Sequence, residues 1–252
     1  MLTHPTMEQL KALGLSGMAE ALSEQLEDRS AREMTFEDRL AVLVDRETRH
    51  RETRRYQTRL RQAQLRLKAY VEDIDYSAGR GLDRTLIGHL ASNQWIRDGR
   101  NLLITGASGC GKSYLACAFG EKACRDNLGV RYYRLPRLLE ELALARAGGT
   151  YARLLKRLAR ADLLILDDWG LATMTAEQRR DLLEVLDDRC GRTATIVTSQ
   201  LPVAQWHELI GEATVADAIL DRLIHSAHRI ELHGESMRRR YARAQESELE
   251  DA

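Results

Sequence analysis

One short segment of the chain has the residue types and the spacing needed to hold a row of phosphates. Residues 106–113 are Gly-Ala-Ser-Gly-Cys-Gly-Lys-Ser, which match the pattern Gly-x4-Gly-Lys-Ser/Thr. Glycines let successive backbone N–H groups turn toward phosphate, and a helix beginning there adds unpaired N–H groups and partial positive charge. In this pattern Lys112 contacts the β- and γ-phosphates and the Ser113 hydroxyl binds Mg²⁺. The alternative is a glycine-rich turn without a ligand, but an apolar run precedes the segment and a helical pattern follows it. The predicted nucleotide-binding residues are Gly106, Ala107, Ser108, Gly109, Cys110, Gly111, Lys112, Ser113 and Tyr114.

Two carboxylates, Asp167 and Asp168, follow the apolar run Leu163–Leu166. Ligands of open α/β sheets bind outside the carboxyl ends of the strands, where these side chains would emerge. We expect Asp167 to hold the Mg²⁺ shell and Asp168 to orient or deprotonate the attacking water. Any strand that meets its loop can end in this way, so the phosphate loop upstream is what favours a catalytic interpretation.

A second apolar run, Thr193–Thr198, also ends in polar side chains, Ser199 and Gln200. If this strand lies beside the Asp167 strand, Gln200, or Thr198 or Ser199 next to it, can reach the γ-phosphate or its water. The alternative is that these side chains cap the following turn, and the residues alone leave both interpretations open.

Strand-like and helix-like segments alternate after Gly99 and must position these motifs. Strands are expected at Asn101–Thr105, Val130–Arg134, Leu163–Leu166 and Thr193–Thr198, with a fifth candidate at His228–Leu232. Helices are expected at 112–126, 136–147 and 176–189. This alternation predicts an α/β class domain with a parallel sheet flanked by helices.

A helical module precedes this domain. An amphipathic helix is expected from about Thr6 to Leu26, and Thr35 with Asp38 forms a capping box that opens a longer helix, expected to reach Val71. The predicted organisation is a small all-helical domain at 1–76 for oligomerisation or for DNA or partner docking, a linker at 77–98, the nucleotide-binding domain at 99–245 and an acidic tail at 246–252.

The composition narrows the function classes. The 252 residues carry 38 Lys and Arg against 38 Asp and Glu, and this zero net charge alone argues against a nucleic-acid binder. However, Arg46–Lys68 and Arg131–Arg160 are basic whereas 162–188 and the tail are acidic, which predicts separate basic and acidic faces. No apolar run reaches the ~18–20 residues of a membrane span, and the start lacks a secretory signal pattern. Four cysteines without a Cys-x-x-Cys pair argue against a zinc site or a disulfide scaffold and favour a cytoplasmic protein.

The ordered set of motifs resembles the AAA+ ATPases of the DnaC/IstB clade. The segments on which the resemblance depends are Asn101–Gly106 leading into the phosphate loop, Asp167-Asp168-Trp169-Gly170, Thr198-Ser199-Gln200, Ala218–Leu223 and Gly234–Arg238. The amino-terminal segment Leu10–Met18 and the Arg-rich helix that ends near Glu72–Tyr76 are similar to IstB, so the resemblance covers nearly the whole chain. IstB proteins are helper ATPases encoded with the transposase of a class of bacterial insertion sequences.

The resemblance implies an AAA+ P-loop NTPase core at 99–245 and roles for further residues. The family's arginine finger would fall on Arg222, its sensor-2 arginine on Arg238 and its sensor-1 residue on Gln200. Most AAA+ proteins have Glu where this chain has Asp168, which implies slow hydrolysis, and Gln200 replaces the commoner Asn. The short segment after Arg229 implies a reduced or absent lid, so that a neighbouring subunit would cover the nucleotide.

The resemblance also implies partners. ATP and Mg²⁺ would be the cofactors, and ATP-dependent homo-oligomers would assemble on duplex DNA, activate an IstA-type transposase and disassemble on hydrolysis. Binding is expected through phosphates without sequence specificity, with Arg146, Arg153, Lys156 and Arg157 as candidate DNA contacts, although such a charge run is also typical of a solvated helix face. A DnaC-like helicase loader acting on single strands is the alternative. A small-molecule kinase is a third hypothesis, which the arginine finger and the reduced lid disfavour.

Overall fold

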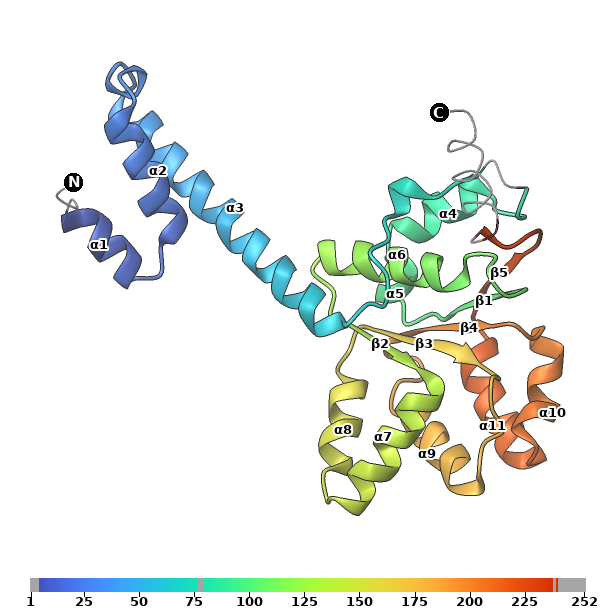
Figure 1. Cartoon of the computed structure of the whole chain (residues 1–252). Helices are drawn as coiled ribbons and strands as arrows, with labels where there is room; N and C mark the ends of the chain where they lie inside the picture. Colours follow the sequence, from blue (N-terminus) through green and yellow to red (C-terminus); the bar gives the residue numbers. More distant parts are fainter. Residues whose placement is uncertain (1–4, 77–78, 238, 240–252) are drawn as a thin grey trace. The chain divides into compact units, whose positions relative to one another are not determined.

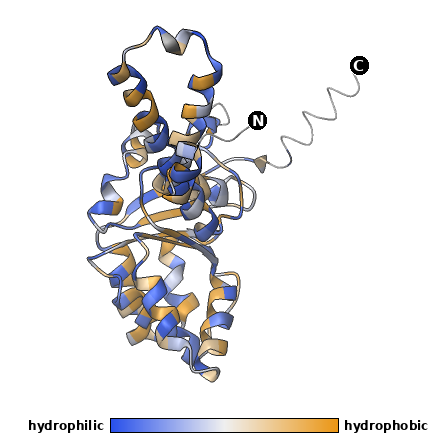
Figure 2. Ribbon diagram, turned by 90° about the vertical axis from the view of Figure 1, so that its left-hand side faces the viewer, coloured by the Kyte–Doolittle hydropathy of each residue, from blue (hydrophilic) through white to orange (hydrophobic). Residues whose placement is uncertain are grey.

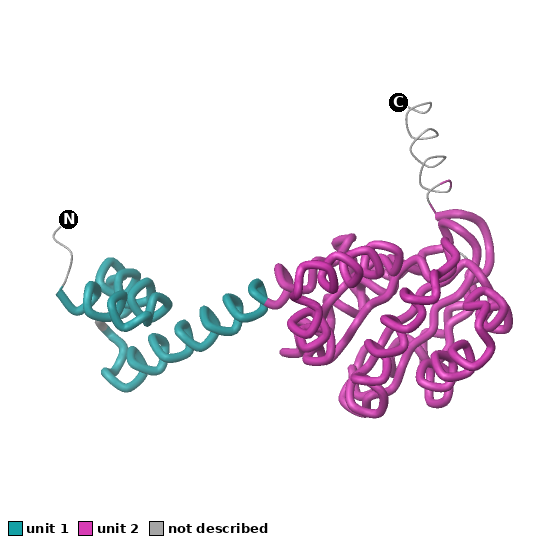
Figure 3. Tube along the Cα trace, turned by 90° about the horizontal axis from the view of Figure 1, so that it is seen from below, with its two compact units in different colours: residues 1–58 teal, residues 59–252 magenta. Residues whose placement is uncertain are grey.

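The computed structural model describes residues 5–76, 79–237 and 239. The chain forms two compact units, residues 1–58 and residues 59–252, which Figure 3 colours separately. The boundary falls inside a long helix, so the last residues of that helix belong to the second unit.

The first unit is helical, as its sequence pattern predicts. Its elements are α1 (Pro5–Ala12), α2 (Ser16–Glu27), the short 3₁₀ helix η1 (Ser30–Arg32) and the beginning of α3 (Phe36–Ala63). The single helix expected from Thr6 to Leu26 is in fact two helices, because Gly14 between them has a left-handed φ of 72°. One of the two hydrogen bonds of the predicted capping box is present at the start of α3, where the backbone N–H of Asp38 donates to Thr35 Oγ1 at 3.2 Å. The Asp38 carboxylate accepts from the Thr35 hydroxyl at 2.7 Å.

A buried carboxylate joins α2 to α3. Glu47 of α3 accepts hydrogen bonds from the backbone N–H groups of Gly17 (2.8 Å) and Met18 (3.2 Å), at the start of α2 where unpaired donors and the helix dipole favour an anion. Arg51 pairs with the same carboxylate at 2.6 Å. Burial opposes ionisation, but these hydrogen bonds outweigh it and lower the pKa of Glu47.

The second unit is built on a parallel sheet. Its strands are β1 (Leu102–Gly106), β2 (Val130–Arg134), β3 (Leu163–Trp169), β4 (Ala194–Ser199) and β5 (His228–Leu232). Among the described residues they form one five-stranded sheet in the order β2-β3-β4-β1-β5, with every neighbouring pair parallel. The central strands are apolar and buried along most of their length, as expected where helices cover both faces. The five predicted strands are confirmed, with shifts at some ends, and both the phosphate loop and the two aspartates lie at the carboxyl edge.

Helices cover both faces of this sheet (Figure 1). One face carries α4 (Arg84–Ala91), α5 (Gln94–Arg97) and α6 (Lys112–Arg125). The other face carries α7 (Leu135–Ala147), α8 (Tyr151–Ala159), α9 (Ala176–Asp187), η3 (Val203–Gln205), α10 (Trp206–Ile210) and α11 (Ala213–Ile224). These helices bear hydrophobic and hydrophilic residues along their lengths (Figure 2). Apolar side chains of the second face, such as Leu138, Leu182 and Ile219, join one buried cluster with the sheet.

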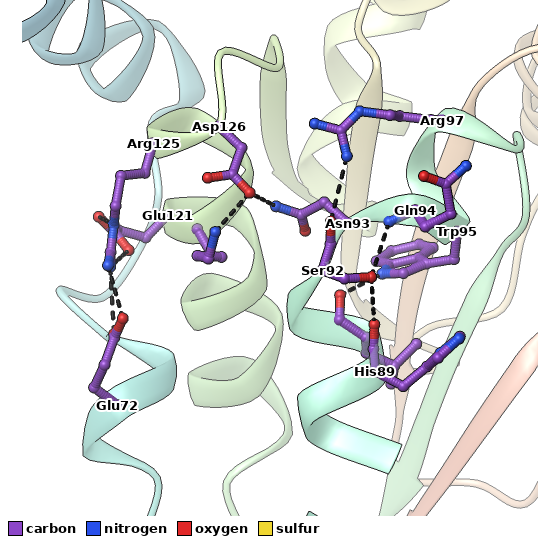
Figure 4. Close-up of polar contacts among 12 residues, drawn as sticks. Glu72, His89, Ser92, Asn93, Gln94, Trp95, Arg97, Glu121, Arg125 and Asp126 are labelled. Carbon is purple, nitrogen blue, oxygen red and sulfur yellow. Dashed lines mark hydrogen bonds and ion pairs between the residues drawn. The ribbon is translucent and has the colours of Figure 1, made fainter. Parts of the chain in front are cut away.

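The segment between α3 and β1 is fastened to α6 by polar contacts (Figure 4). Glu72, in the short helix η2 (Val71–Asp73), pairs with Arg125 at 2.7 Å, and Arg125 also pairs with Glu121. Asn93, which precedes α5, donates to Asp126 at 2.9 Å. The segment therefore packs as part of the second unit.

The unit boundary differs from the predicted organisation. The helical domain was predicted at 1–76, whereas residues 59–76 lie in the second unit, and α3 ends at Ala63 rather than near Val71. The helix stops where Gln64 adopts a left-handed φ of 53°. In the described part of the chain, none of the helices has both the length and the apolar content for a membrane crossing.

Candidate nucleotide-binding site

The phosphate loop connects β1 to α6 with a backbone that glycine permits. Gly109 and Gly111 have φ values of 82° and 104°, which residues with a side chain rarely adopt. A Cβ at Gly109 would also lie 2.2 Å from Ser236 Oγ, and one at Gly111 would lie 2.7 Å from an Arg80 nitrogen. The glycines therefore serve the loop conformation and also the close packing of neighbouring segments against its outer side.

Lys112 and Ser113 occupy the first turn of α6, where unpaired backbone N–H groups and the helix dipole favour a phosphate. The Lys112 ammonium donates to the carbonyl oxygens of Gly106 and Ala107, both at 2.7 Å, so it lies across the loop. The Ser113 hydroxyl donates to Asp167 Oδ1 at 2.8 Å. The two predicted Mg²⁺ ligands are thus neighbours in space although 54 positions separate them in the chain.

The carboxylate of Asp167 is completely buried and accepts hydrogen bonds on both oxygens. Ser113 and the Thr198 hydroxyl donate to Oδ1, and the hydroxyl of Tyr132, from β2, donates to Oδ2. Arg66 Nη1 lies 3.6 Å from Oδ2. A buried carboxylate in an apolar sheet requires such partners, and here they also fix its orientation.

Asp168 combines backbone strain with a strong ion pair. Its φ is 64°, in the left-handed region, and the β3–β4 register shifts between Leu166 and Trp169. Non-glycine residues in this region cluster at functional sites, where the surrounding structure maintains them. The carboxylate Oδ2 accepts from Arg134 Nε at 2.6 Å and lies 3.7 Å from Arg66 Nη1. Asp168 therefore faces the phosphate loop between two guanidinium groups.

The three polar residues at the end of β4 and directly after it, Thr198, Ser199 and Gln200, have different contacts. Thr198 donates to Asp167 and accepts from the backbone N–H of Asp168 at 3.2 Å, so it positions both aspartates. Ser199 accepts from the backbone N–H of Leu201, which is the capping role considered as the alternative. Gln200 is exposed and lines the pocket beside the loop.

These groups surround a pocket of about 390 Å³. Of the predicted residues it is lined by Ser108, Gly109, Gly111, Lys112, Ser113, Tyr114, Asp168 and Gln200. Cys110 has a buried side chain, and Gly106 and Ala107 present carbonyl oxygens to Lys112.

Three arginines of the pocket lining, Arg66, Arg80 and Arg134, were not predicted from the sequence. Arg134 could have been found, because it ends a predicted strand and its backbone is in register with Asp167. Arg80 is buried and donates to the carbonyl oxygen of Cys110 at 3.2 Å. Arg66 carries no local signal that separates it from the other arginines of its run.

Arg222 lies away from this pocket. It is in the last turn of α11, pairs with Asp187, and lines a second pocket together with Asn101, which immediately precedes β1. Asn101 Nδ2 donates to the Arg222 carbonyl at 2.8 Å, so Arg222 is beside the amino end of the strand whose carboxyl end forms the phosphate loop. The other predicted arginine, Arg238, lies outside the described residues.

The four candidate DNA contacts differ in how their charges are balanced. Arg146 stacks on Tyr151 and pairs with Asp181, and Arg157 pairs with Glu141 at 2.6 Å. The remaining two, Arg153 and Lys156, are on the exposed face of α8 and make no ion pair within the described part of the chain.

Comparison with known proteins identifies the family of this chain. Residues 8–245 match the family model described as IstB-like ATP binding protein. The chain belongs to the IstB-like ATP-binding proteins. An insertion sequence ATP-binding protein of Sinorhizobium fredii is 53% identical over 243 residues, which cover 96% of this chain and 99% of the relative. The IS21 ATP-binding protein of Pseudomonas aeruginosa is 32% identical, over 92% of this chain and 86% of the relative.

Solved structures share the fold of this IstB-like protein. A crystal structure of DnaI has a TM-score of 0.55 at 22% identity and covers 66% of this chain and 92% of that chain. A crystal structure of the DnaC helicase loader has a TM-score of 0.53 at 17% identity and covers 66% and 97%, respectively. The predicted AAA+ P-loop NTPase core, with its parallel sheet and flanking helices, is confirmed.

The residues of the site fit a triphosphate with Mg²⁺. Mg²⁺ prefers oxygen ligands and is commonly held by one or two carboxylates together with the phosphates of a nucleotide. Ser113 Oγ, in the first turn of α6, and Asp167 Oδ1, in β3, lie 2.8 Å apart and are such donors. When bound, the ion would neutralise charge that develops on the phosphates.

Proposed function

We propose that this IstB-like protein is an ATPase that assembles on duplex DNA in an ATP-dependent manner and activates a partner transposase, with hydrolysis driving disassembly. The observation that carries the catalytic part is the grouping of Lys112, Ser113, Asp167 and Asp168 at one edge of the sheet. Lys112 would bind the terminal phosphates, Ser113 and Asp167 the Mg²⁺, and Asp168 the attacking water.

Hydrolysis by this site requires a second subunit. Arg222 lies near the amino end of β1, whereas the phosphate loop follows its carboxyl end. A five-residue strand spans about 17 Å at ~3.3 Å per residue. That separation supports the proposal that Arg222 stabilises transferred phosphate in the pocket of a neighbour, as arginine fingers do in trans.

The DNA-binding part of the proposal rests on exposed basic side chains. Arg153 and Lys156 of α8 have uncompensated charges on a surface helix, so they are better candidates for phosphate contacts than Arg146 and Arg157. In the first unit, Arg46, Arg49, His50 and Arg54 line a groove of about 360 Å³ along α3. Arg46 pairs with Glu24 and Arg49 with Asp45, so Arg54 is the better candidate there for a phosphate contact. Binding through phosphates would weaken steeply with salt.

The partner is inferred from the relatives, whose printed names place them in insertion sequences. A transposase is the client that this context supports. The helicase-loader hypothesis rests on the DnaC-like fold alone, because the sequence identity between this chain and the DnaC helicase loader is 17%.

Mixing of variants tests the central claim. Lys112→Ala is expected to lose ATP binding, and Arg222→Ala is expected to bind ATP but lose DNA-stimulated hydrolysis. A mixture of the two should regain activity, because each Lys112→Ala subunit supplies an intact finger to an Arg222→Ala pocket. Sedimentation with a nonhydrolysable ATP analogue should give large complexes on duplex DNA, which purified cognate transposase then joins. A protein that stays monomeric with saturating ATP and duplex, or a mixture that never regains activity, would refute the proposal.

A further inference from the structure

A hydrogen-bonded chain leads from the segment after α3 to the buried carboxylate of Asp167. Resting on the proposed ATPase function, we propose that Tyr132 and Arg66 are positioning residues of the Mg²⁺ site. They hold Oδ2 of Asp167 and thereby direct Oδ1 toward Ser113. Neither residue belongs to the phosphate loop or to the acidic motif of β3.

The two oxygens of Asp167 have separate sets of neighbours. Oδ1 accepts from Ser113 and Thr198, whereas Oδ2 accepts from the Tyr132 hydroxyl and lies 3.6 Å from Arg66 Nη1. The terminal torsion of an aspartate is broad, so contacts rather than intrinsic preference fix its carboxylate plane. Because Tyr132 and Arg66 occupy Oδ2, the oxygen of Asp167 that can bind Mg²⁺ together with Ser113 is Oδ1.

Tyr132 is suited to be a permanent donor. Its side chain points from β2 into the sheet core, is 8% exposed, and donates to Asp167. Because the residue is buried, little solvent competes for this hydroxyl, and its hydrogen bond keeps Oδ2 of Asp167 occupied.

Arg66 extends this contact to both acidic residues. Its side chain hydrogen-bonds with Tyr132, and its Nη1 lies 3.6 Å from Asp167 Oδ2 and 3.7 Å from Asp168 Oδ2. A guanidinium between adjacent carboxylates reduces their mutual repulsion. Arg134, by contrast, makes an ion pair with Asp168 alone among the described residues.

The segment that carries Arg66 is held on α6 on both sides of it. Arg59 Nε donates to the Cys124 carbonyl at 2.8 Å, and Glu72 pairs with Arg125 (Figure 4). Between them, Leu65 passes so close to α6 that a Cβ on Gly120 would lie 2.9 Å from its Cδ2. This packing places Arg66 beside the two aspartates.

Metal affinity and nucleotide affinity, measured separately on the full chain, test the proposal. A fluorescent nonhydrolysable ATP analogue gives nucleotide affinity without metal, and the electron paramagnetic resonance signal of free Mn²⁺ gives the metal affinity of the protein–nucleotide complex. Tyr132→Phe and Arg66→Gln are each expected to weaken Mn²⁺ binding about tenfold, the lower range for partners that orient metal ligands. For Tyr132→Phe the metal-free nucleotide affinity should stay within about twofold of that of the unsubstituted protein, because this side chain does not line the pocket. Arg66 does line the pocket, so Arg66→Gln is expected to weaken metal-free nucleotide binding as well, and the test of Arg66 is the Mn²⁺ affinity of the nucleotide complex.

Tyr133→Phe is the matched control, because the neighbouring Tyr133 hydroxyl contacts Arg157 at 3.0 Å and not the site. It should leave both affinities unchanged. Unchanged Mn²⁺ affinity in Tyr132→Phe and Arg66→Gln would overturn the inference, as would an equal loss of metal-free nucleotide binding in Tyr132→Phe, which would indicate general distortion. If the folded, unsubstituted protein binds no nucleotide at all, the proposed function itself fails.

Discussion

Asn101, immediately before β1, joins the sheet to the helix that carries Arg222. Its side-chain Nδ2 donates to the carbonyl oxygens of Arg222 (2.8 Å) and Leu223 (3.1 Å), and its Oδ1 accepts from the backbone N–H of Thr195 (2.9 Å). The side chain is 8% exposed, so water cannot readily replace these bonds. Asn101→Ala removes all of them. At ~1 kcal/mol for each hydrogen bond, the free energy of unfolding of the second unit should fall by about 3 kcal/mol.

Tryptophan fluorescence reports this unit specifically, because Trp95, Trp169 and Trp206 all belong to it. At ~2–4 °C per kcal/mol for a unit of this size, Tm should fall by about 6–12 °C. Nucleotide affinity should persist below Tm, because the phosphate loop is at the opposite end of β1. Thr193→Val is the matched control: its buried hydroxyl has no hydrogen-bond partner among the described residues, so its removal should cost little. A loss below about 1 kcal/mol in Asn101→Ala, or an equal loss in Thr193→Val, would refute the assignment of this energy to the three hydrogen bonds.

Other predictions address catalysis, DNA and the thiols. Asp168→Asn should bind ATP and remain assembled on DNA without turnover, measured by phosphate release and sedimentation; normal release would exclude Asp168 from activating water. The double substitution Arg153→Glu with Lys156→Glu removes ~2 phosphate contacts, so affinity for duplex DNA in 100 mM salt should fall at least about tenfold. The slope of log affinity against log salt concentration should become shallower by about 2. An unchanged slope would contradict the assignment of these two residues to phosphate contacts. Burial raises the pKa of the Cys117 thiol to about 11, so at pH 8 iodoacetamide should alkylate exposed Cys190 and spare Cys117, as read by mass spectrometry. Similar rates at the two cysteines would show that α6 opens readily.

Local patterns in the sequence were sufficient where the chemistry is carried by consecutive residues. The phosphate loop and the acidic pair each follow an apolar strand, and parallel pairing brings both to one edge of the sheet, as predicted. Arg134 is an intermediate case, since its place beside the aspartates follows from strand pairing that the alternation of elements already implied.

Residues positioned by irregular packing could not be predicted in this way. Arg66 belongs to a run of arginines that a periodicity argument treats as one solvated helix face. The helix ends at Ala63, and the chain then crosses α6 in a path set by side chains from distant elements. The helix was predicted to continue because no glycine or proline interrupts it, yet Gln64 adopts the left-handed conformation that ends it. The division of the chain near Thr58 rather than 76 has the same origin, because contacts of residues 59–76 with α6 outweigh their helical continuity with the first unit.

The separation of Arg222 from the phosphate loop also limits how copies of this chain could assemble. The pocket opens at the carboxyl edge of the sheet, and Arg222 lies at the amino edge, where it pairs with Asp187 in its own subunit. In a dimer with a twofold axis, the same surface of each copy faces its partner. An arginine finger that acts in trans instead needs the amino edge of the sheet in one copy to face the carboxyl edge of the sheet in the next copy. Such head-to-tail contacts close into a ring or continue as a helix. Each contact would also have to release Arg222 from Asp187, so the assembly that completes the site would break an ion pair present in the single subunit. Asp187→Asn should therefore lower the protein concentration at which ATP turnover becomes half-maximal, and an unchanged concentration dependence would show that this ion pair does not restrain the finger.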